Sequence, residues 1–219
     1  AIEMRHFSDQ AVYAQIDAIL DQDSLGKIVT FACNWCAYAG ADTAGVGRMA
    51  YPPNARIIRT MCSGRVNPEF VWYAFKKGAP VVLVSGCHYV DCHYIDANRN
   101  TTRRVDGLWD GLEKAGLRPE RLQLEWCSAA EGGRWQTIMR EVEKKRQSVT
   151  PEEAEQTRTV LAAAKVPNPR TPKAEDEKQS AEYLCLRCGH HWSGLFSANV
   201  ERICPSCRSN SVRWLKPKS

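Results

Sequence analysis

Cysteine is the residue type that could do most chemistry in this sequence of 219 residues, which contains ten of them. Six lie in the first two thirds of the chain and four lie in the last sixth. We find no pattern typical of a secretory signal, so this many cysteines in a chain of this size predict metal or redox chemistry in a reducing compartment. We therefore expect a cytoplasmic protein without a disulfide framework.

The first group combines two close pairs with one isolated thiol. Cys33 and Cys36 form a C-x2-C pair, Cys87 and Cys92 form a C-x4-C pair, and Cys62 stands alone. Together they supply more than four thiolates, which is enough for an iron-sulfur cluster. A thioredoxin-like dithiol at Cys33 and Cys36 is an alternative, but it leaves the other three cysteines unexplained. A closed tetrahedral zinc site is another, but it leaves a fifth thiol without a role.

Four short apolar runs predict strands that could position these thiols, at 27–31, 56–61, 80–85 and 122–126. Helical patterns follow them. Asn67 can cap a helix that starts at Pro68, residues 105–112 carry one apolar face that stops before Gly116, and a last helix is expected at 134–145. Strands that alternate with helices predict an α/β fold with a small open parallel sheet and helices on both faces.

This topology predicts where the cysteines meet. The carboxyl ends of parallel strands lie on one edge of a sheet, where open α/β folds bind their ligands. The loops that follow the first three strands carry five cysteines: Cys33, Cys36, Cys62, Cys87 and Cys92. Cys127 follows the fourth strand beside Trp126, and we expect it to be a buried structural thiol.

Two other patterns near these loops, a pair of histidines and a glycine motif, do not indicate a binding site. His88 and His93 flank the C-x4-C pair, and with five thiols available we expect hydrogen-bonding or loop roles for them instead of metal ligation. Residues 45–50 match a G-x-G-x-x-A nucleotide fingerprint. Tyr51 and the two prolines after it leave no room for the helix that should hold a pyrophosphate, so we do not interpret this match as a nucleotide site.

The last four cysteines form two C-x2-C pairs, Cys185 with Cys188 and Cys204 with Cys207, separated by fifteen residues. This spacing is typical of a zinc ribbon, whose four sulfurs surround one metal ion. The segment is too short to fold on an apolar core alone. Iron in a rubredoxin-like site is the alternative metal. The neighbouring histidines, His190 and His191, are expected to be exposed.

Composition predicts how these parts are organised. Residues 147–181 are rich in Pro, Glu and Lys, and we expect a tether there that is partly helical after a cap at Thr150. The expected order is an amphipathic lead-in helix capped by Ser8 (1–25), an iron-sulfur α/β domain (26–146), a linker (147–181) and a zinc ribbon (182–219).

Overall composition excludes several classes of protein. Hydrophobic residues make up 43% of the chain and charged residues 25%, which is ordinary globular composition. No apolar run approaches the roughly 20 residues of a membrane span. A net charge of +5 is too mild and too evenly spread to indicate nucleic acid. We expect the ribbon aromatics Trp192, Phe196 and Trp214 to form its core or to dock a partner protein, with nucleic acid less favoured.

Four segments around the first cysteine group together resemble the delta-subunit family of methyl-viologen-reducing hydrogenase, over about residues 26–145. They are FACNWCAYAGADTAGVGRMAYP, RIIRTMCSGRVNPEF, GCHYVDCHYIDAN and LEWCSAAEG. The resemblance implies a 2Fe-2S cluster bound by four of the five cysteines and electron exchange with the flavin-bearing, A-type subunit of heterodisulfide reductase. The sequence departs from the family at Tyr89-Val90, where Pro-Gly is usual, at Ala32, where another cysteine is common, and at Cys127, where an apolar residue is usual.

The first ten residues, AIEMRHFSDQ, and the amphipathic helix after them resemble the segment that trails a ferredoxin-type motif in A-type heterodisulfide reductase proteins. The chain is thus expected to be part of a longer polypeptide with an A-type heterodisulfide reductase part upstream. We expect an electron-transfer module, without substrate chemistry of its own, between a hydrogenase or other dehydrogenase and the flavin partner. The alternatives are a dithiol oxidoreductase using Cys33 and Cys36 and a zinc-ribbon protein that binds nucleic acid.

Overall fold

A computed structural model of the chain describes residues 7–170, 172, 176–177 and 179–215. Its first part is a parallel sheet with the strand order β2-β1-β3-β4, and its second part is an antiparallel sheet with the order β6-β5-β7. The expected α/β class and the small C-terminal module are therefore confirmed. The expectations that concern residues 1–6 and 216–219, and the linker residues 171, 173–175 and 178, lie outside the described residues.

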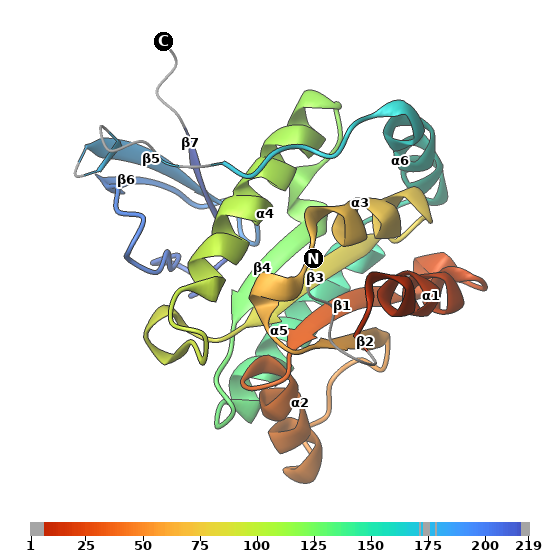
Figure 1. Ribbon diagram of the computed structural model, residues 1–219, viewed down its shortest axis with the longest axis horizontal. Helices are drawn as coiled ribbons and strands as arrows, with labels where there is room; N and C mark the ends of the chain where they lie inside the picture. Colours follow the sequence, from red (N-terminus) through yellow and green to blue (C-terminus); the bar gives the residue numbers. More distant parts are fainter. Residues whose placement is uncertain (1–6, 171, 173–175, 178, 216–219) are drawn as a thin grey trace.

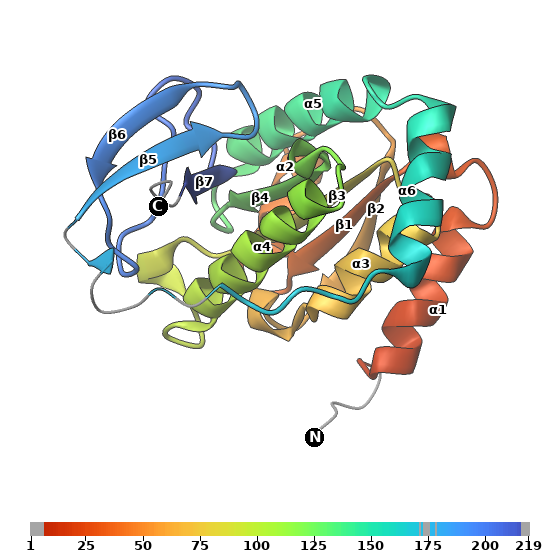
Figure 2. The same cartoon turned by 90° about the horizontal axis from the view of Figure 1, so that it is seen from above.

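The parallel sheet consists of β1 (Ile28–Cys33), β2 (Ala55–Thr60), β3 (Val81–Gly86) and β4 (Leu122–Trp126). Every residue of β1, β3 and β4 is buried, as expected for strands that are covered on both faces. Figure 2 shows α2 (Ala37–Val46) and α5 (Gly132–Gln147) on one face. The other face carries α1 (Asp9–Leu20), α3 (Pro68–Lys76), α4 (Ala97–Lys114) and α6 (Pro151–Ala163).

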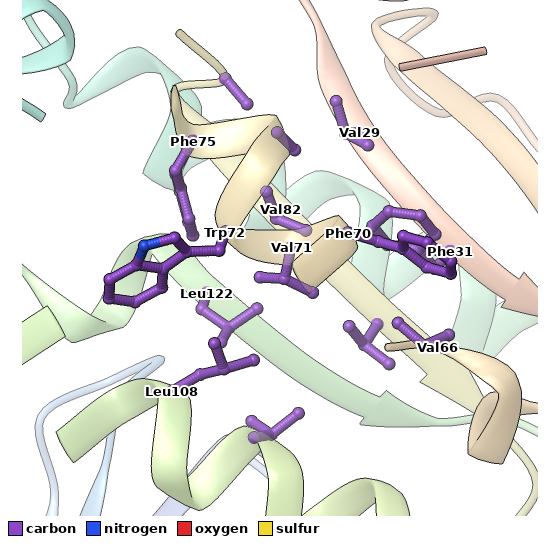
Figure 3. Close-up of a cluster of buried hydrophobic side chains, with 14 of the residues drawn as sticks. Val29, Phe31, Val66, Phe70, Val71, Trp72, Phe75, Val82, Leu108 and Leu122 are labelled. Atoms are coloured by element: carbon purple, nitrogen blue, oxygen red, sulfur yellow. The ribbon is translucent and has the colours of Figure 1, made fainter. Parts of the chain in front are cut away.

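Side-chain alternation along the strands divides the interior into two layers. Val29, Phe31, Val82 and Val84 point toward α3 and α4, where Figure 3 shows Phe31 beside Phe70. The intervening residues pack under α2 and α5, in a layer that includes Trp135: Ile28, Ala32, Val81 and Leu83. This period-two pattern holds the strands in one register, which in turn fixes where each strand ends.

Local signals start and end the helices where the sequence indicated. The Asn67 side chain accepts a hydrogen bond from the Glu69 N–H at 3.1 Å, and Ser8 caps α1 in the same way. Gly78 and Gly116 follow α3 and α4 with φ of +94° and +72°, a region that favours glycine. These caps confirm the predicted start of α3 and the predicted stop after α4.

Helix α2 was not predicted. Its buried side chains are alanines, so the apolar stripe that identifies an amphipathic helix is weak. Gly40 lets the helix approach the loop after β4, because a Cβ there would lie 2.7 Å from the Ser128 carbonyl oxygen. Gly45 and Gly47 stand at the carboxyl end of this helix, which supports our rejection of a nucleotide site at 45–50.

Residues 151–170 of the segment expected to be a tether (147–181) pack against the domain. Helix α6 is capped by Thr150 as expected, but its Leu161 is fully buried in the main core. The chain beyond it lies along α4, at Gly107 and Gly111, where a Cβ would collide with Asn168 and Pro167. Composition concealed this packing because the buried stripe of α6 is only Ala154, Thr157 and Leu161.

The C-terminal module consists of β5 (Ser180–Cys185), β6 (His191–Leu195) and β7 (Val212–Leu215). Its small core includes Tyr183, Phe196 and Trp214. Phe196 and Trp214 thus form part of the ribbon core, which was one of the two roles expected for them. Figures 1 and 2 show the module beside β4, at one end of the parallel sheet. Among the described residues, no helix combines the length and the apolar character needed to span a bilayer.

Candidate metal centres

The carboxyl ends of β1, β2 and β3 bring thiols together at one edge of the sheet. Cys33 is the last residue of β1, Cys87 follows β3 directly, and Cys62 lies two residues beyond β2. The Sγ atoms of Cys33 and Cys87 are 3.8 Å apart. Cys33 also contacts Cys62, and Cys36 contacts Cys87. We name the five cysteines of this edge the cysteine rim: Cys33, Cys36, Cys62, Cys87 and Cys92.

The rim has a buried floor and a more open margin. Cys33 is 1% exposed and Cys87 is 2% exposed. Cys36, Cys62 and Cys92 are partly exposed. Cys92 follows the short turn η3 (Tyr89–Asp91), and its charge contributes to the raised pKa of Cys36 and of Cys62. The loops thus place Cys92 near Cys36 and Cys62, at the more open margin of the rim.

Contacts among the rim thiols lower the pKa of one thiol and raise the pKa of others. Hydrogen bonds from Cys62 and Cys87 lower the pKa of Cys33 to about 2. Donation to Cys33, together with burial, raises the pKa of Cys62 and of Cys87. Burial also raises the pKa of Cys36. One thiolate is therefore stabilised by its neighbours, whereas several thiolates at such short distances require positive charge between them.

Backbone groups around the rim suit sulfur with negative charge. Cys36 is the N-cap residue of α2, so the positive end of this helix dipole lies beside the rim. The Gly64 N–H donates to Cys62 Sγ at 3.3 Å. Hydrogen bonds of this type stabilise thiolate ligands and tune the metal that they hold.

The two histidines of the C-x4-C region are engaged elsewhere. His88 Nδ1 lies 2.9 Å from Glu201 Oε1, and His88 Nε2 lies 2.9 Å from Glu131 Oε2. These carboxylates raise the pKa of His88. His93 stacks on Trp35 with ring centroids 4.0 Å apart. These contacts fit the hydrogen-bonding or loop roles that we expected for the two histidines.

Cys127 lies in the loop after β4 and is buried away from solvent. Its Sγ lies 3.5 Å from the carbonyl oxygens of Ser128 and Glu131, and burial raises its pKa to about 12. A neutral, packed thiol of this kind fits a structural role.

The four C-terminal sulfurs lie closer together than the sulfurs of the rim. All four Sγ atoms lie within 4.8 Å of one another, and no other such group of His, Cys, Asp or Glu occurs in the part of the chain that the structure describes. Cys185 and Cys207 are 3.6 Å apart, and Cys188 and Cys204 are 3.7 Å apart. We name these residues the ribbon site: Cys185, Cys188, Cys204 and Cys207.

Two similar turns build the ribbon site. The Gly189 N–H donates to the Cys185 carbonyl at 2.8 Å, and the Arg208 N–H donates to the Cys204 carbonyl at 3.0 Å. Gly189 and Arg208 both have positive φ, of +78° and +62°. His190 and His191 are exposed, as expected. Four sulfurs with no open position suit a structural metal.

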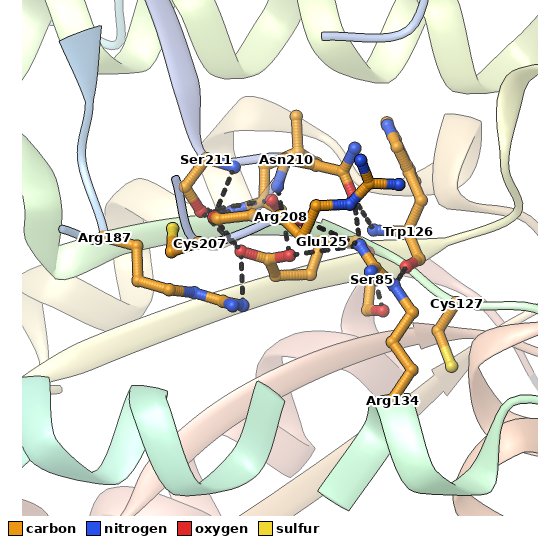
Figure 4. Close-up of polar contacts among 12 residues, drawn as sticks. Ser85, Glu125, Trp126, Cys127, Arg134, Arg187, Cys207, Arg208, Asn210 and Ser211 are labelled. Carbon is orange, nitrogen blue, oxygen red and sulfur yellow. Dashed lines mark hydrogen bonds and ion pairs between the residues drawn. The ribbon is translucent and has the colours of Figure 1, made fainter. Parts of the chain in front are cut away.

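Sequence reasoning missed the polar contacts that join the ribbon to the sheet. Glu125 of β4 is fully buried, and Arg187, which lies between Cys185 and Cys188, pairs with it at 2.7 Å (Figure 4). The N–H groups of Leu124 and Trp126 donate to Ser211 Oγ at 3.0 Å and to Asn210 Oδ1 at 3.1 Å. Residues after the second cysteine pair therefore cover the β4 edge. The alternation of Gln123 and Glu125 in an apolar strand was the available signal.

Comparisons with known proteins agree with this arrangement. The model of the family described as "Methyl-viologen-reducing hydrogenase, delta subunit" matches residues 28–149. The chain is 53% identical over 125 residues to the vhc iron-sulfur subunit of the F420-non-reducing hydrogenase of Methanococcus voltae. This match covers 57% of the chain and 87% of that relative.

A second kind of relative is much longer. The chain is 45% identical over 152 residues to the A-type subunit of the ferredoxin:CoB-CoM heterodisulfide reductase of Methanosarcina mazei. This match covers 69% of the chain but only 19% of that relative. The matched family covers more than half of the chain, and the chain belongs to the delta-subunit family of methyl-viologen-reducing hydrogenase.

Proposed function

We propose that this chain is an electron-transfer component whose cysteine rim binds a 2Fe-2S cluster. It relays electrons between a hydrogenase or other dehydrogenase and a flavin-containing partner of the A-type heterodisulfide reductase kind. The observation that carries the proposal is the convergence of five sulfurs, from the end of β1 and from three strand-to-helix loops, on one edge of the sheet.

The spacing of the rim favours a cluster over a single ion. In the described residues, no three rim sulfurs lie within 4.8 Å of one another, whereas the ribbon sulfurs do. A cluster with two irons spreads four thiolates over a larger volume than one tetrahedral ion. When bound, it supplies a site that accepts and returns one electron. The chain contributes the thiolates, the N-terminus of α2 and the Gly64 N–H.

Direct contacts indicate which four thiols bind the cluster. Cys33, Cys36, Cys62 and Cys87 are joined through Cys33 and Cys87. The charge of Cys92 is among the smaller causes that raise the pKa of Cys36 and of Cys62. We therefore propose Cys92 as the fifth thiol, which the cluster does not require.

A dithiol oxidoreductase is less compatible with these contacts. Its nucleophile would have to reach a substrate, but Cys33 is 1% exposed. The more open partner, Cys36, has a raised pKa because of burial, which disfavours its reactive thiolate. Both properties suit ligands of an enclosed cofactor better than a reactive disulfide.

For the ribbon site we propose structural zinc. Its four sulfurs form a closed tetrahedral set, which is typical of structural zinc and leaves no position for substrate. Iron would accept the same ligands, so metal analysis of the purified protein distinguishes the two.

Docking of a redox partner is supported by the surface beside the rim. Trp35 and Tyr94 are 41% and 45% exposed, and Val90 and Ile95 are 91% and 82% exposed. Apolar side chains gathered around a buried cofactor are suited to a protein interface. The relatives are a hydrogenase subunit and an A-type heterodisulfide reductase subunit, which supports proteins of these two kinds as partners.

The match to part of a long relative supports the proposal that this segment belongs to a longer, cytoplasmic polypeptide with an A-type heterodisulfide reductase part. The intact mass of the protein isolated from its native source tests this. A mass well above 24.6 kDa is expected, and a native chain of that mass would contradict it.

Single Cys→Ser variants of the rim, purified without oxygen, test the ligand assignment. Replacing Cys33, Cys36, Cys62 or Cys87 should abolish the absorption that dithionite bleaches, because a serine hydroxyl is a poor ligand for iron in a sulfur cluster. Cys92→Ser should keep it. If all five variants retain full iron and sulfide, the rim is not the cluster site.

A further inference from the structure

One ribbon carboxylate reaches into the loop that carries two rim cysteines. We propose that Glu201 is a positioning residue for the Cys87–Cys92 loop, so that the folded ribbon orders one wall of the cysteine rim. The inference rests on the proposed cluster at the rim, and its test includes a measurement that does not need the cluster.

The contacts of Glu201 fall on the first residues after Cys87. Its Oε1 lies 2.9 Å from His88 Nδ1, and its Oε2 accepts a hydrogen bond from the Tyr89 N–H at 3.0 Å. His88 precedes η3, and Tyr89 begins it. Glu201 therefore satisfies a free N–H at the start of this turn, as a capping side chain does at a helix, but it comes from more than 100 residues away.

Other segments hold the backbone of this loop in place. Tyr89 is buried and its hydroxyl donates to Thr102 Oγ1 at 2.8 Å, whereas Val90 is 91% exposed and contributes little packing. Asn98 of α4 donates to the carbonyls of Cys87 and His88 at 3.1 and 2.8 Å. Asn98 thus holds the carbonyls on one side while Glu201 holds the N–H and the imidazole on the other.

The position of Glu201 is in turn set by the ribbon site. Glu201 lies three residues before Cys204, and its Oε1 accepts a hydrogen bond at 2.9 Å from Asn210, which lies three residues after Cys207. Asn210 also donates to the Arg202 carbonyl at 3.0 Å. Glu201 and the residue that binds its carboxylate, Asn210, thus lie on either side of the second cysteine pair.

Two ion pairs keep this part of the ribbon against the α/β domain. Arg202 forms two hydrogen bonds to Asp106 of α4, at 3.0 and 2.8 Å. Arg187 pairs with Glu125 of β4 (Figure 4). Because these groups are buried, the ribbon has little freedom to move relative to the sheet. The Glu201 carboxylate is therefore held against the Cys87–Cys92 loop in one orientation.

The test compares Glu201→Ala with Glu182→Ala in the full chain. Glu182 is an exposed ribbon carboxylate whose recorded hydrogen bond, with Ser193, stays within the ribbon. In zinc-loaded protein purified without oxygen, Glu201→Ala should keep its zinc but lose its cluster to an iron chelator about tenfold faster, the scale seen for residues that orient metal ligands. Its electron paramagnetic resonance line shape should also change. Glu182→Ala should match the wild type.

A conservative variant separates positioning from folding. In Glu201→Gln the amide oxygen can still accept from the Tyr89 N–H, so its rate of cluster loss should fall between those of wild type and Glu201→Ala. Wild-type rates and line shape in both Glu201 variants would overturn the proposal. Loss of zinc in both would also overturn it, since Glu201 would then act in ribbon folding.

Alkylation of the zinc-loaded apoprotein keeps this test independent of the cluster. Glu201→Ala should speed modification of Cys87 and Cys92 by iodoacetamide several-fold relative to the wild type and to Glu182→Ala, because local opening exposes the thiols. Absence of iron and sulfide from the wild type would reject the proposed function alone. Equal alkylation rates in all three proteins would reject the positioning role.

Discussion

The cysteine rim and the ribbon site assemble their sulfurs in different ways. The ribbon site uses two short turns, each of which fixes a pair of cysteines through its own backbone hydrogen bond. The rim takes thiols from three loops, and its geometry depends on how β1, β2 and β3 align. Local spacing thus defines the compact ribbon site, for which we propose one ion, whereas sheet topology defines the wider rim, for which we propose a cluster.

The two sites also differ in what holds the surrounding protein together. The parallel sheet has apolar layers on both faces, with Trp109, Trp126 and Trp135 fully or almost fully buried. Among the described residues, the ribbon core contains seven buried residues, two of which are cysteines of the ribbon site. The sheet can therefore fold around its side chains, whereas the structural metal that we propose would stabilise the ribbon.

Removing the ribbon metal should produce the largest effect and test this difference directly. Structural zinc contributes roughly 10–16 kcal/mol in small domains at neutral pH. We expect Cys185→Ser to abolish zinc binding and to remove amide hydrogen-exchange protection from β5, β6 and β7. Strands β1 and β3 should stay protected. Continued protection of the ribbon without metal would contradict the account.

Breaking the ion pair that docks the ribbon on β4 should have the second-largest effect. Glu125→Ala leaves the buried guanidinium of Arg187 without its partner, and breaking such a pair costs about 3–5 kcal/mol. The free energy of unfolding, measured with denaturant, should fall by about this amount. A double variant, Glu125→Gln with Arg187→Met, should recover much of the loss. Equal stability of Glu125→Ala and wild type would show that the ribbon is not docked on β4.

The packed connection at α6 should show a somewhat smaller effect. Leu161 is fully buried in the core layer that includes α3, and truncating a buried leucine costs roughly 2–5 kcal/mol. Leu161→Ala should therefore lower the free energy of unfolding by about 3 kcal/mol. Val160→Ala, at a partly buried neighbour, is the matched control and should cost less. A neutral Leu161→Ala would restore the tether interpretation.

Substitution of Cys127 should have the smallest effect. It distinguishes a structural thiol at the sheet edge from the rim thiols that we propose as ligands. Cys127→Ser places a hydroxyl in a buried site and should cost about 1–3 kcal/mol. Iron and sulfide content should not change, because burial favours the neutral form of this thiol and its Sγ packs against the carbonyl oxygens of Ser128 and Glu131. Loss of the cluster in Cys127→Ser would show that the rim extends farther than the five loop cysteines.

Residue patterns predicted the elements that have strong local signals. The four strands and the cap at Asn67 were predicted because β-branched runs and capping side chains act locally. They also predicted that Cys33, Cys62 and Cys87 would meet, since parallel strands end on one edge. Helix α2 was missed because small side chains bury it without an amphipathic stripe.

Contacts between distant segments lay beyond sequence reasoning. Leu161 alone did not reveal that α6 packs on α3, and the glycines of α4 did not reveal the chain that lies on them. The pairing of Glu125 with Arg187 and the reach of Glu201 to His88 depend on ribbon docking. Such contacts follow from tertiary structure and leave only weak traces in local pattern.

The most direct test of the central claim is metal and sulfide analysis of the protein purified without oxygen, combined with its visible and electron paramagnetic resonance spectra. The account predicts about two irons, two acid-labile sulfides and one zinc per chain, with visible absorption that dithionite bleaches. A colourless protein that contains zinc alone would contradict it.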